Sequence, residues 1–353
     1  MDPRTAPVLP QEKVRRMIDV RDLTKVYPGV LAVDRISFRV EKGEVIGFLG
    51  PNGAGKSTTM RILTCLFPPT TGTVSVGGFD VLRDSMKVRR MIGYLPENNP
   101  LYTEMRVEEY LLFRAQIKQA PRADRTRIVG SAMEKCGLAE RRTTIIDQLS
   151  KGFRQRVGMA DAILNEPEII ILDEPTIGLD PNQVRTVREL IRELGQRRTV
   201  ILSTHILSEV ERTCGRVLII NRGRLVADGT PSQIINKFTL TGRVRLELRG
   251  TGEGVKEIIE RLPNVKRVAW MNKGELQDYL VEPANAADLR SELFKCAAQH
   301  SWDLVELGHE RVSLEDAFVE VTAGPGSSSG VRRDTPRVEH PEPVKVPETG
   351  GKG

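Results

Sequence analysis

Hydrophobic positions along the first two-thirds of the chain form short apolar runs separated by longer amphipathic stretches. Ile169–Leu172 and Val200–Ser203 are almost continuously apolar, and each follows sequence typical of a helix. Such runs, alternating with helices, indicate a parallel sheet that is buried on both faces. The pattern therefore predicts an α/β domain. Its other expected elements are strands at Met17–Leu23, Ile36–Val40, Val45–Leu49, Thr73–Val76, Arg216–Asn221 and Arg224–Asp228, and helices at Val107–Gln119 and Arg125–Cys136.

A different pattern begins after about residue 241, where Val244, Leu246 and Leu248 alternate with charged residues as a strand does. The elements that follow are expected at Val255–Leu262 (helix), Val265–Trp270 and Leu276–Val281 (strands), Ala287–Gln299 (helix), Trp302–Leu307 (strand) and Ser313–Val321 (helix). This order predicts a small, separate α+β domain. We therefore divide the chain into a flexible leader (1–16), a first domain (17–240), an accessory domain (241–322) and a disordered tail (323–353) that is rich in Pro and Gly.

Composition excludes several classes of protein. Of 353 residues, 39% are hydrophobic and 28% charged, as in soluble globular proteins. The net charge of +6 is spread diffusely, so we expect no nucleic-acid partner. The longest uncharged stretch, Ile62–Phe79, contains prolines and glycines, and the N-terminus has no apolar core, so neither a spanning helix nor a signal peptide is expected. The four cysteines are too widely spaced for a metal or redox motif.

Residues 50–57 match the phosphate-binding pattern G-x-x-x-x-G-K-[ST]. In this pattern glycines let backbone N–H groups surround phosphate oxygens, the lysine reaches the β- and γ-phosphates and the hydroxyl is a Mg²⁺ ligand. The alternative is a chance glycine turn, but a strand precedes the match and the helix-compatible Ser57–Leu66 follows it. We therefore predict nucleotide binding by Gly50, Pro51, Asn52, Gly53, Ala54, Gly55, Lys56, Ser57 and Thr58.

The second half of such a site is an acidic residue at the end of a buried strand. Asp173 and Glu174 directly follow Ile169–Leu172. We predict that Asp173 holds Mg²⁺, usually through water, and that Glu174 orients or deprotonates the attacking water. A strand that simply meets solvent at this point is the alternative, and the phosphate-binding pattern makes it the weaker one.

The sequence between these two motifs resembles the ATP-binding cassette of ABC transporters. Leu149–Arg156 is similar to the family's signature motif, and the resemblance extends over Met17–Phe238. It implies a P-loop NTPase fold in which a mixed-sheet core carries an antiparallel β subdomain and a helical subdomain, with ATP and Mg²⁺ as cofactors. The site residues that it adds are Tyr27 (stacking on adenine), Glu97 (nucleotide and metal contacts), Ser150 and Gly152 (γ-phosphate bound by the opposite subunit), Asp180 (loop beside the nucleotide) and His205 (γ-phosphate contact).

Within the family, Lys56, Glu174 and His205 correspond to catalytic residues, and Ser57, Glu97 and Asp173 to metal ligands. Two motifs depart from the usual pattern: Glu97 stands in place of glutamine, and in the signature Lys151 and Phe153 stand in place of glycine and glutamine. Together with Asp180–Gln183, these variants resemble the branch of the family that serves ABC-2 type exporters, in particular the gliding-motility type of ATPase. Ser313–Phe318 resembles the end of that branch's accessory domain, although, taken alone, a capped amphipathic helix is the better explanation.

The resemblance implies an ATP-hydrolysing subunit that dimerises on ATP, as a homodimer or with a second cassette. It would drive a separate integral membrane permease through the Glu97 loop and the helical region 98–164. Such a subunit is cytoplasmic and peripheral on the inner face of the cell membrane. The alternative is a soluble, non-transport ABC ATPase that acts on nucleic acid or the ribosome. That class usually has a second cassette or a long insertion, and neither is found here. An inactive interaction module is disfavoured by the intact Lys56, Asp173, Glu174 and His205.

Overall fold

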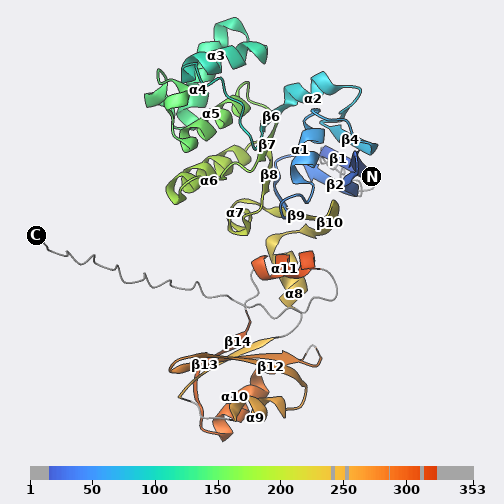
Figure 1. Ribbon diagram of the computed structural model, residues 1–353, viewed down its shortest axis with the longest axis vertical. Helices are drawn as coiled ribbons and strands as arrows, with labels where there is room; N and C mark the ends of the chain where they lie inside the picture. Colours follow the sequence, from blue (N-terminus) through green and yellow to red (C-terminus); the bar gives the residue numbers. More distant parts are fainter. Residues whose placement is uncertain (1–15, 240–242, 251–253, 286, 311–313, 324–353) are drawn as a thin grey trace, which may run out of the picture. The chain divides into compact units, whose positions relative to one another are not determined.

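The structure is a computed structural model that describes residues 16–239, 243–250, 254–285, 287–310 and 314–323. Figure 1 shows the cassette region over 16–239 and the smaller accessory region that follows it. The expected leader and tail fall outside the described residues, apart from their innermost positions 16 and 323. The domain ranges given above therefore stay a prediction.

A six-stranded sheet forms the centre of the cassette region, in the order β10-β9-β3-β8-β7-β6. All its strands are parallel except β10, which pairs with β9 as an antiparallel hairpin. The hairpin turns at Arg222 (φ 48°) and Gly223 (φ 78°), two left-handed residues as in a type I′ turn. The sheet that the apolar runs predicted is thus confirmed. Its strands are β3 (Val45–Leu49), β6 (Ile92–Leu95), β7 (Ile169–Asp173), β8 (Thr199–Thr204), β9 (Arg216–Asn221) and β10 (Arg224–Gly229).

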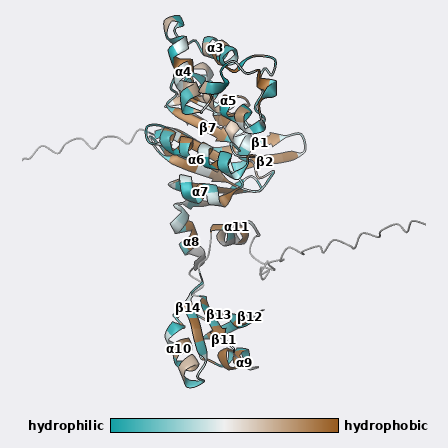
Figure 2. Cartoon of the chain, turned by 90° about the vertical axis from the view of Figure 1, so that its left-hand side faces the viewer, coloured by the Kyte–Doolittle hydropathy of each residue, from teal (hydrophilic) through white to brown (hydrophobic). Residues whose placement is uncertain are grey.

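Side chains of the central strands point alternately into two hydrophobic clusters. In β7, Ile170 and Leu172 belong to the cluster that the helices cover, whereas Ile169 and Ile171 belong to the cluster shared with the second sheet. This alternation is the two-residue period of a strand, and it explains why every residue of β7 is buried. In Figure 2 the strands of this sheet are mostly brown, whereas α6 (Pro181–Gly195) carries both brown and teal residues.

The second sheet is antiparallel, with the order β2-β1-β4-β5. It packs against α1 through a cluster that includes Phe38 and Phe48. Strand β1 extends beyond the predicted Met17–Leu23 to Tyr27, because register shifts against β2 bend the strand and let pairing continue. The strands are β1 (Arg16–Tyr27), β2 (Val30–Glu41), β4 (Thr71–Val76) and β5 (Phe79–Asp80).

Helices α3, α4 and α5 form the helical subdomain at the upper left of Figure 1. One buried carboxylate links α5 to α3: Asp161 of α5 pairs with Arg114 Nη2 of α3 and with Nζ of Lys118, which directly follows α3, each at 3.0 Å. The predicted helices at 107–119 and 125–136 are confirmed to within two residues. The cassette helices are α1 (Lys56–Leu63), α2 (Ser85–Met91), α3 (Val107–Ile117), α4 (Arg125–Lys135), α5 (Lys151–Ile163), α6, α7 (Leu207–Thr213) and α8 (Pro231–Thr239).

The accessory region follows the predicted β-α-β-β-α-β order. Its antiparallel sheet has the order β12-β13-β11-β14, the split β-α-β arrangement in which the first and third strands are central. Helix α10 begins at Arg290 rather than Ala287, because the Asp288 carboxylate accepts a hydrogen bond from the Arg290 N–H (3.1 Å) and starts the helix there. The elements are β11 (Val244–Arg249), α9 (Val255–Glu260), β12 (Val265–Lys273), β13 (Leu276–Pro283), α10 (Arg290–Gln299) and β14 (Asp303–His309).

The last helix, α11 (Leu314–Ala323), contacts the cassette rather than the accessory core. Its Leu314 and Ala317 belong to the helix-covered hydrophobic cluster of the cassette, and Asn221 Nδ2 donates to Thr322 O (2.9 Å). Within the described ranges, no helix has the length and hydrophobicity that crossing a bilayer requires.

The fold predicts a sharp contrast between two glycines. A Cβ on Gly93 of β6 would lie 2.0 Å from Ala162 O of α5, so the helix could not stay in place. We expect Gly93→Ala to destabilise the cassette by about 1–3 kcal/mol through overpacking. Gly130 lies exposed in α4 with nothing near its Cβ position, and Gly130→Ala should stabilise by about 0.5–1 kcal/mol. Thermal unfolding of both variants checks this; an unchanged midpoint for Gly93→Ala would contradict the packing described.

Candidate nucleotide-binding site

The predicted phosphate-binding loop connects β3 to α1. Lys56 opens α1 and is 6% exposed; its Nζ donates to Gly50 O (2.8 Å) and Pro51 O (3.3 Å) and thereby draws the loop into a ring. Backbone N–H groups at the start of α1 and the lysine ammonium give this loop a positive potential. The remaining predicted loop residues lie along the same turn, with Thr58 in the first turn of α1.

Two glycines are needed for the loop's shape. Gly55 has φ 108°, and a Cβ on it would lie 2.6 Å from Ala32 O. A Cβ on Gly50 would lie 2.4 Å from Ile220 O. The loop thus sits directly against the backbone of β2 and β9, which fixes its position at the carboxyl end of the central sheet.

Asp173, the last residue of β7, is fully buried. Its Oδ1 accepts hydrogen bonds from Ser203 Oγ (2.6 Å) and Ser57 Oγ (3.3 Å), whereas its Oδ2 has no partner among the described residues. The structure therefore brings together Ser57 and Asp173, two of the three predicted metal ligands. An ionised oxygen without a partner in a buried position is costly unless a cation or a polar group meets it.

Glu174 lies between two other predicted catalytic side chains. Its Oε1 is 3.4 Å from Lys56 Nζ, and its Oε2 accepts a hydrogen bond from His205 Nδ1 at 2.8 Å. The backbone of Glu174 has φ 50°, an uncommon value for a residue with a side chain, and its N–H donates to Ser203 O (2.9 Å). Strain of this kind is concentrated at functional sites, and here it turns the carboxylate from the strand toward the phosphate-binding loop.

The signature residues lie elsewhere, at the start of α5, which Figure 1 draws well apart from α1. Ser150 caps α5 and accepts from Phe153 N (3.4 Å), while Asp180 caps α6 and accepts from Gln183 N (2.9 Å). The two helix starts meet, because the Gln183 side chain covers Gly152 so closely that a Cβ there would be 2.1 Å from Gln183 Oε1. The structure therefore groups Ser150, Gly152 and Asp180 with one another.

Phe153, one of the departures from the signature pattern, is held between two arginines. The guanidinium carbons of Arg141 and Arg156 lie 5.4 and 5.2 Å from its ring centroid. Such cation–π contacts stabilise a partly exposed ring by about 0.5–1 kcal/mol each. The aromatic ring thus packs within the helical subdomain.

The last two predicted contacts lie at the ends of strands. Tyr27 ends β1, with its ring edge-to-face on Phe67 at 6.3 Å and the Lys25 ammonium 5.1 Å from its centroid. Glu97 is exposed in the loop after β6. Burial raises the pKa of the neighbouring Tyr94 to about 12, and the charges of Asp173 and Glu97 add to this rise. Among the described residues, no hydrogen bond or ion pair joins Tyr27 or Glu97 to Lys56, Glu174 or His205.

Sequence reasoning missed Ser203, which we took as part of an apolar strand. The signal was available, because a hydroxyl in a fully buried strand needs a hydrogen-bond partner. Its partner could not be named, since only the pairing of β7 with β8 places Ser203 beside Asp173.

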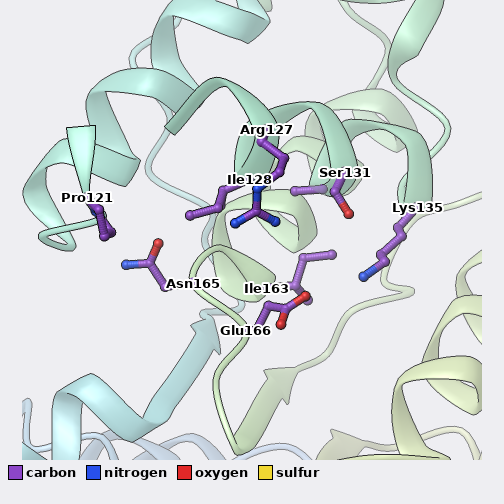
Figure 3. A pocket seen from close by; sticks show the side chains of 9 residues that line it. Pro121, Arg127, Ile128, Ser131, Lys135, Ile163, Asn165 and Glu166 are labelled. Carbon is purple, nitrogen blue, oxygen red and sulfur yellow. The ribbon is translucent and has the colours of Figure 1, made fainter. Parts of the chain in front are cut away.

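A cavity of about 290 Å³ lies in the helical subdomain, between α4 and the loop after α5 (Figure 3). Arg127 and Lys135 of α4 and Glu166 of the loop line it with polar groups. Its lining includes none of the predicted site residues, and we assign it no role.

A phosphate-binding loop, two consecutive carboxylates where a buried strand ends and a histidine directly after the adjacent strand define a P-loop nucleoside triphosphatase. Comparisons with known proteins agree: the profile of the family "ABC transporter" matches residues 33–177. The chain is 30% identical to the linearmycin resistance ATP-binding protein LnrL of Bacillus subtilis (strain 168), over 87% of this chain and 98% of that one. It is 31% identical to the bacitracin transport ATP-binding protein BcrA of Bacillus licheniformis, with the same two coverages, 87% and 98%.

Among solved structures, the dimeric post-hydrolysis state of the ATP-binding cassette MJ0796, bound to ADP and Pi, superposes with a TM-score of 0.57. It is 25% identical and covers 61% of this chain and 98% of its own. The chain therefore belongs to the ATP-binding proteins of ABC transporters. It is an ATPase that binds ATP, and the predicted cassette fold is confirmed.

The geometry predicts an effect for Ser203. Ser203→Ala removes the shortest hydrogen bond to the buried Asp173 carboxylate, which should destabilise the protein by about 1–3 kcal/mol and lower ATPase activity. Ser208→Ala, on the exposed side of α7, is the matched control and should change stability by less than about 0.5 kcal/mol. Equal unfolding midpoints for the two variants would show that the Ser203–Asp173 contact is unimportant.

Proposed function

We propose that this chain is the energy-supplying subunit of an ABC-2 type exporter. In this proposal two cassettes close over ATP and Mg²⁺ and drive a separate integral membrane permease, with the chain on the cytoplasmic face of the cell membrane. The observation that carries the proposal is the Glu174 carboxylate, held between Lys56 and His205 beside the phosphate-binding loop. The relatives LnrL and BcrA, named for linearmycin resistance and bacitracin transport, support the export part.

The residues at the end of β7 fit a divalent cation. The buried Oδ2 of Asp173 has no hydrogen-bond partner among the described residues, and its Oδ1 accepts a hydrogen bond from Ser57 Oγ. Hydroxyl and carboxylate oxygens are ligands that Mg²⁺ prefers. In this proposal Ser57 and Asp173 hold Mg²⁺, with Glu97 as the further predicted ligand. When bound, the ion would neutralise charge on the β- and γ-phosphates.

Each residue of the triphosphate site has a distinct task in this mechanism. Lys56 exchanges its contact with Glu174 for the β- and γ-phosphate oxygens when ATP enters the loop. The released Glu174 carboxylate then accepts the proton of the attacking water. His205, hydrogen-bonded to Glu174, orients that carboxylate and contacts the γ-phosphate. Catalysis thus relies on positioning and electrostatic stabilisation.

A second cassette is needed because the signature residues of one chain lie on α5, apart from its own phosphate-binding loop. Ser150 and Gly152 would meet the γ-phosphate held by a partner cassette, and Gln183 would have to move aside to uncover Gly152. Asp180, at the start of α6, would lie beside the same nucleotide. The Glu97 loop would couple the closure of the two cassettes to the helical subdomain, since Asn99 Nδ2 in this loop donates to Arg154 O of α5 at 2.9 Å. That subdomain would transmit the movement to the permease.

Replacing the proposed base tests this mechanism. Glu174→Gln keeps the size of the side chain but cannot accept a proton from water, so we expect ATP binding to persist while turnover falls by about 10²–10⁴-fold. Size-exclusion chromatography with ATP should then show a trapped dimer. Glu189→Gln, an exposed position on α6, is the control. Normal hydrolysis by Glu174→Gln would overturn the assignment.

The transport role has its own test. Solubilised membranes from the source cell should yield an integral membrane protein that co-purifies with the tagged chain. Recovery of ribosomes or RNA in its place would favour the soluble, non-transport alternative. ATPase measurements on the purified pair should show a rate that depends on the membrane protein.

A further inference from the structure

One buried carboxylate outside the predicted site contacts both catalytic loops. Glu209 lies in the first turn of α7 and is 4% exposed. Its Oε2 accepts hydrogen bonds from Thr176 Oγ1 at 2.8 Å and from Thr204 Oγ1 at 3.4 Å. Both threonines are buried as well. A single oxygen atom thus joins the loop after β7 to the end of β8.

These contacts close a ring with the predicted catalytic pair. Thr176 is two residues after Glu174, and Thr204 directly precedes His205. The His205–Glu174 hydrogen bond of 2.8 Å closes the ring on the side of the nucleotide site, and Glu209 closes it on the other side. A shift of either loop would therefore break a buried hydrogen bond.

The direction of the hydrogen bonds also suits this arrangement. Thr204 Oγ1 accepts from Ile206 N (3.1 Å), so its own hydrogen is free to be donated to Glu209. These two consecutive hydrogen bonds fix the backbone on both sides of His205. Because His205 is itself half exposed, its position depends on the backbone and on Glu174 rather than on close packing.

Burying the Glu209 carboxylate at this position costs folding free energy. Burial raises the pKa of Glu209, the nearby charge of Glu174 adds to the rise, and Thr176, Thr204 and the Arg188 guanidinium of α6 oppose it. Glu209 Oε1 has no hydrogen-bond partner among the described residues. For stability alone, apolar side chains of similar shape would serve as well or better. The cost suggests a role in the reaction.

We propose that Glu209 is a positioning residue for ATP hydrolysis. By accepting hydrogen bonds from Thr176 and Thr204, it fixes the positions of Glu174 and His205 relative to each other. This inference rests on the proposed roles of Glu174 and His205. Glu209 itself touches neither nucleotide nor water in this proposal. Its effect is on geometry, where a misplacement of about 1 Å can cost about 10²-fold in rate.

The test compares two substitutions of Glu209 by steady-state ATPase kinetics. Glu209→Ala removes the shared acceptor, so we expect kcat to fall by about tenfold to a hundredfold, with KM for ATP within about threefold of the wild-type value. Glu209→Gln keeps a carbonyl oxygen that can accept from both threonines, and should retain most of the wild-type kcat. A merely structural residue would not produce this separation of kcat from KM.

Thr176 gives a second variant that keeps the test decisive if Glu209→Ala fails to fold. Thr176→Val has the same shape but no hydroxyl, and should lower kcat in the same way, while Thr176→Ser should restore it. Unchanged kcat in Glu209→Ala or Thr176→Val would overturn the proposal. So would a loss in Glu209→Gln as large as in Glu209→Ala, or a parallel loss of ATP affinity. Failure of the proposed function is seen separately, as normal hydrolysis by Glu174→Gln.

Discussion

The buried carboxylate at the end of β7 is the constraint on which the site depends. Asp173 is placed in the interior of the protein by the apolar run before it, and a carboxylate there needs hydrogen-bond donors from neighbouring elements. Ser57 of α1 and Ser203 of β8 meet this need. The same arrangement sets the phosphate-binding loop and the next strand beside Glu174. The electrostatic demand of one side chain thus organises three elements that are far apart in the sequence.

Much of this architecture follows from local signals. The apolar runs predicted β7 and β8 and their burial, because a parallel strand covered on both faces is mostly apolar. The phosphate-binding loop could be predicted from its glycines, because the backbone geometry of the loop requires them. A Cβ on Gly50 or Gly55 would collide with a backbone carbonyl oxygen. The accessory domain's order of elements was also predictable, since each element there is short and bounded by turn residues.

What the sequence could not supply depends on register and on long-range contact. Ser203 lies in a segment whose pattern predicts only burial, and no element was predicted around Glu209. The pairing of β7 with β8 and the packing of α7 determine their hydrogen-bond partners, and no local sequence signal encodes either of these contacts. Strand β1 was predicted too short for the same reason, because its continuation to Tyr27 depends on irregular pairing with β2. The hydrogen bonds that complete the site are properties of the fold rather than of any segment.

The alternation of side chains along β7 has a thermodynamic consequence. Ile169 and Ile171 belong to one hydrophobic cluster and Ile170 and Leu172 to the other, so neither cluster can melt without exposing a face of this strand. The two clusters are therefore bound into one cooperative unit, and α11 joins it through Leu314 and Ala317. The accessory sheet has a hydrophobic cluster of its own. The last helix thus shares its hydrophobic cluster with the first region of the chain rather than with the accessory sheet that precedes it in the sequence.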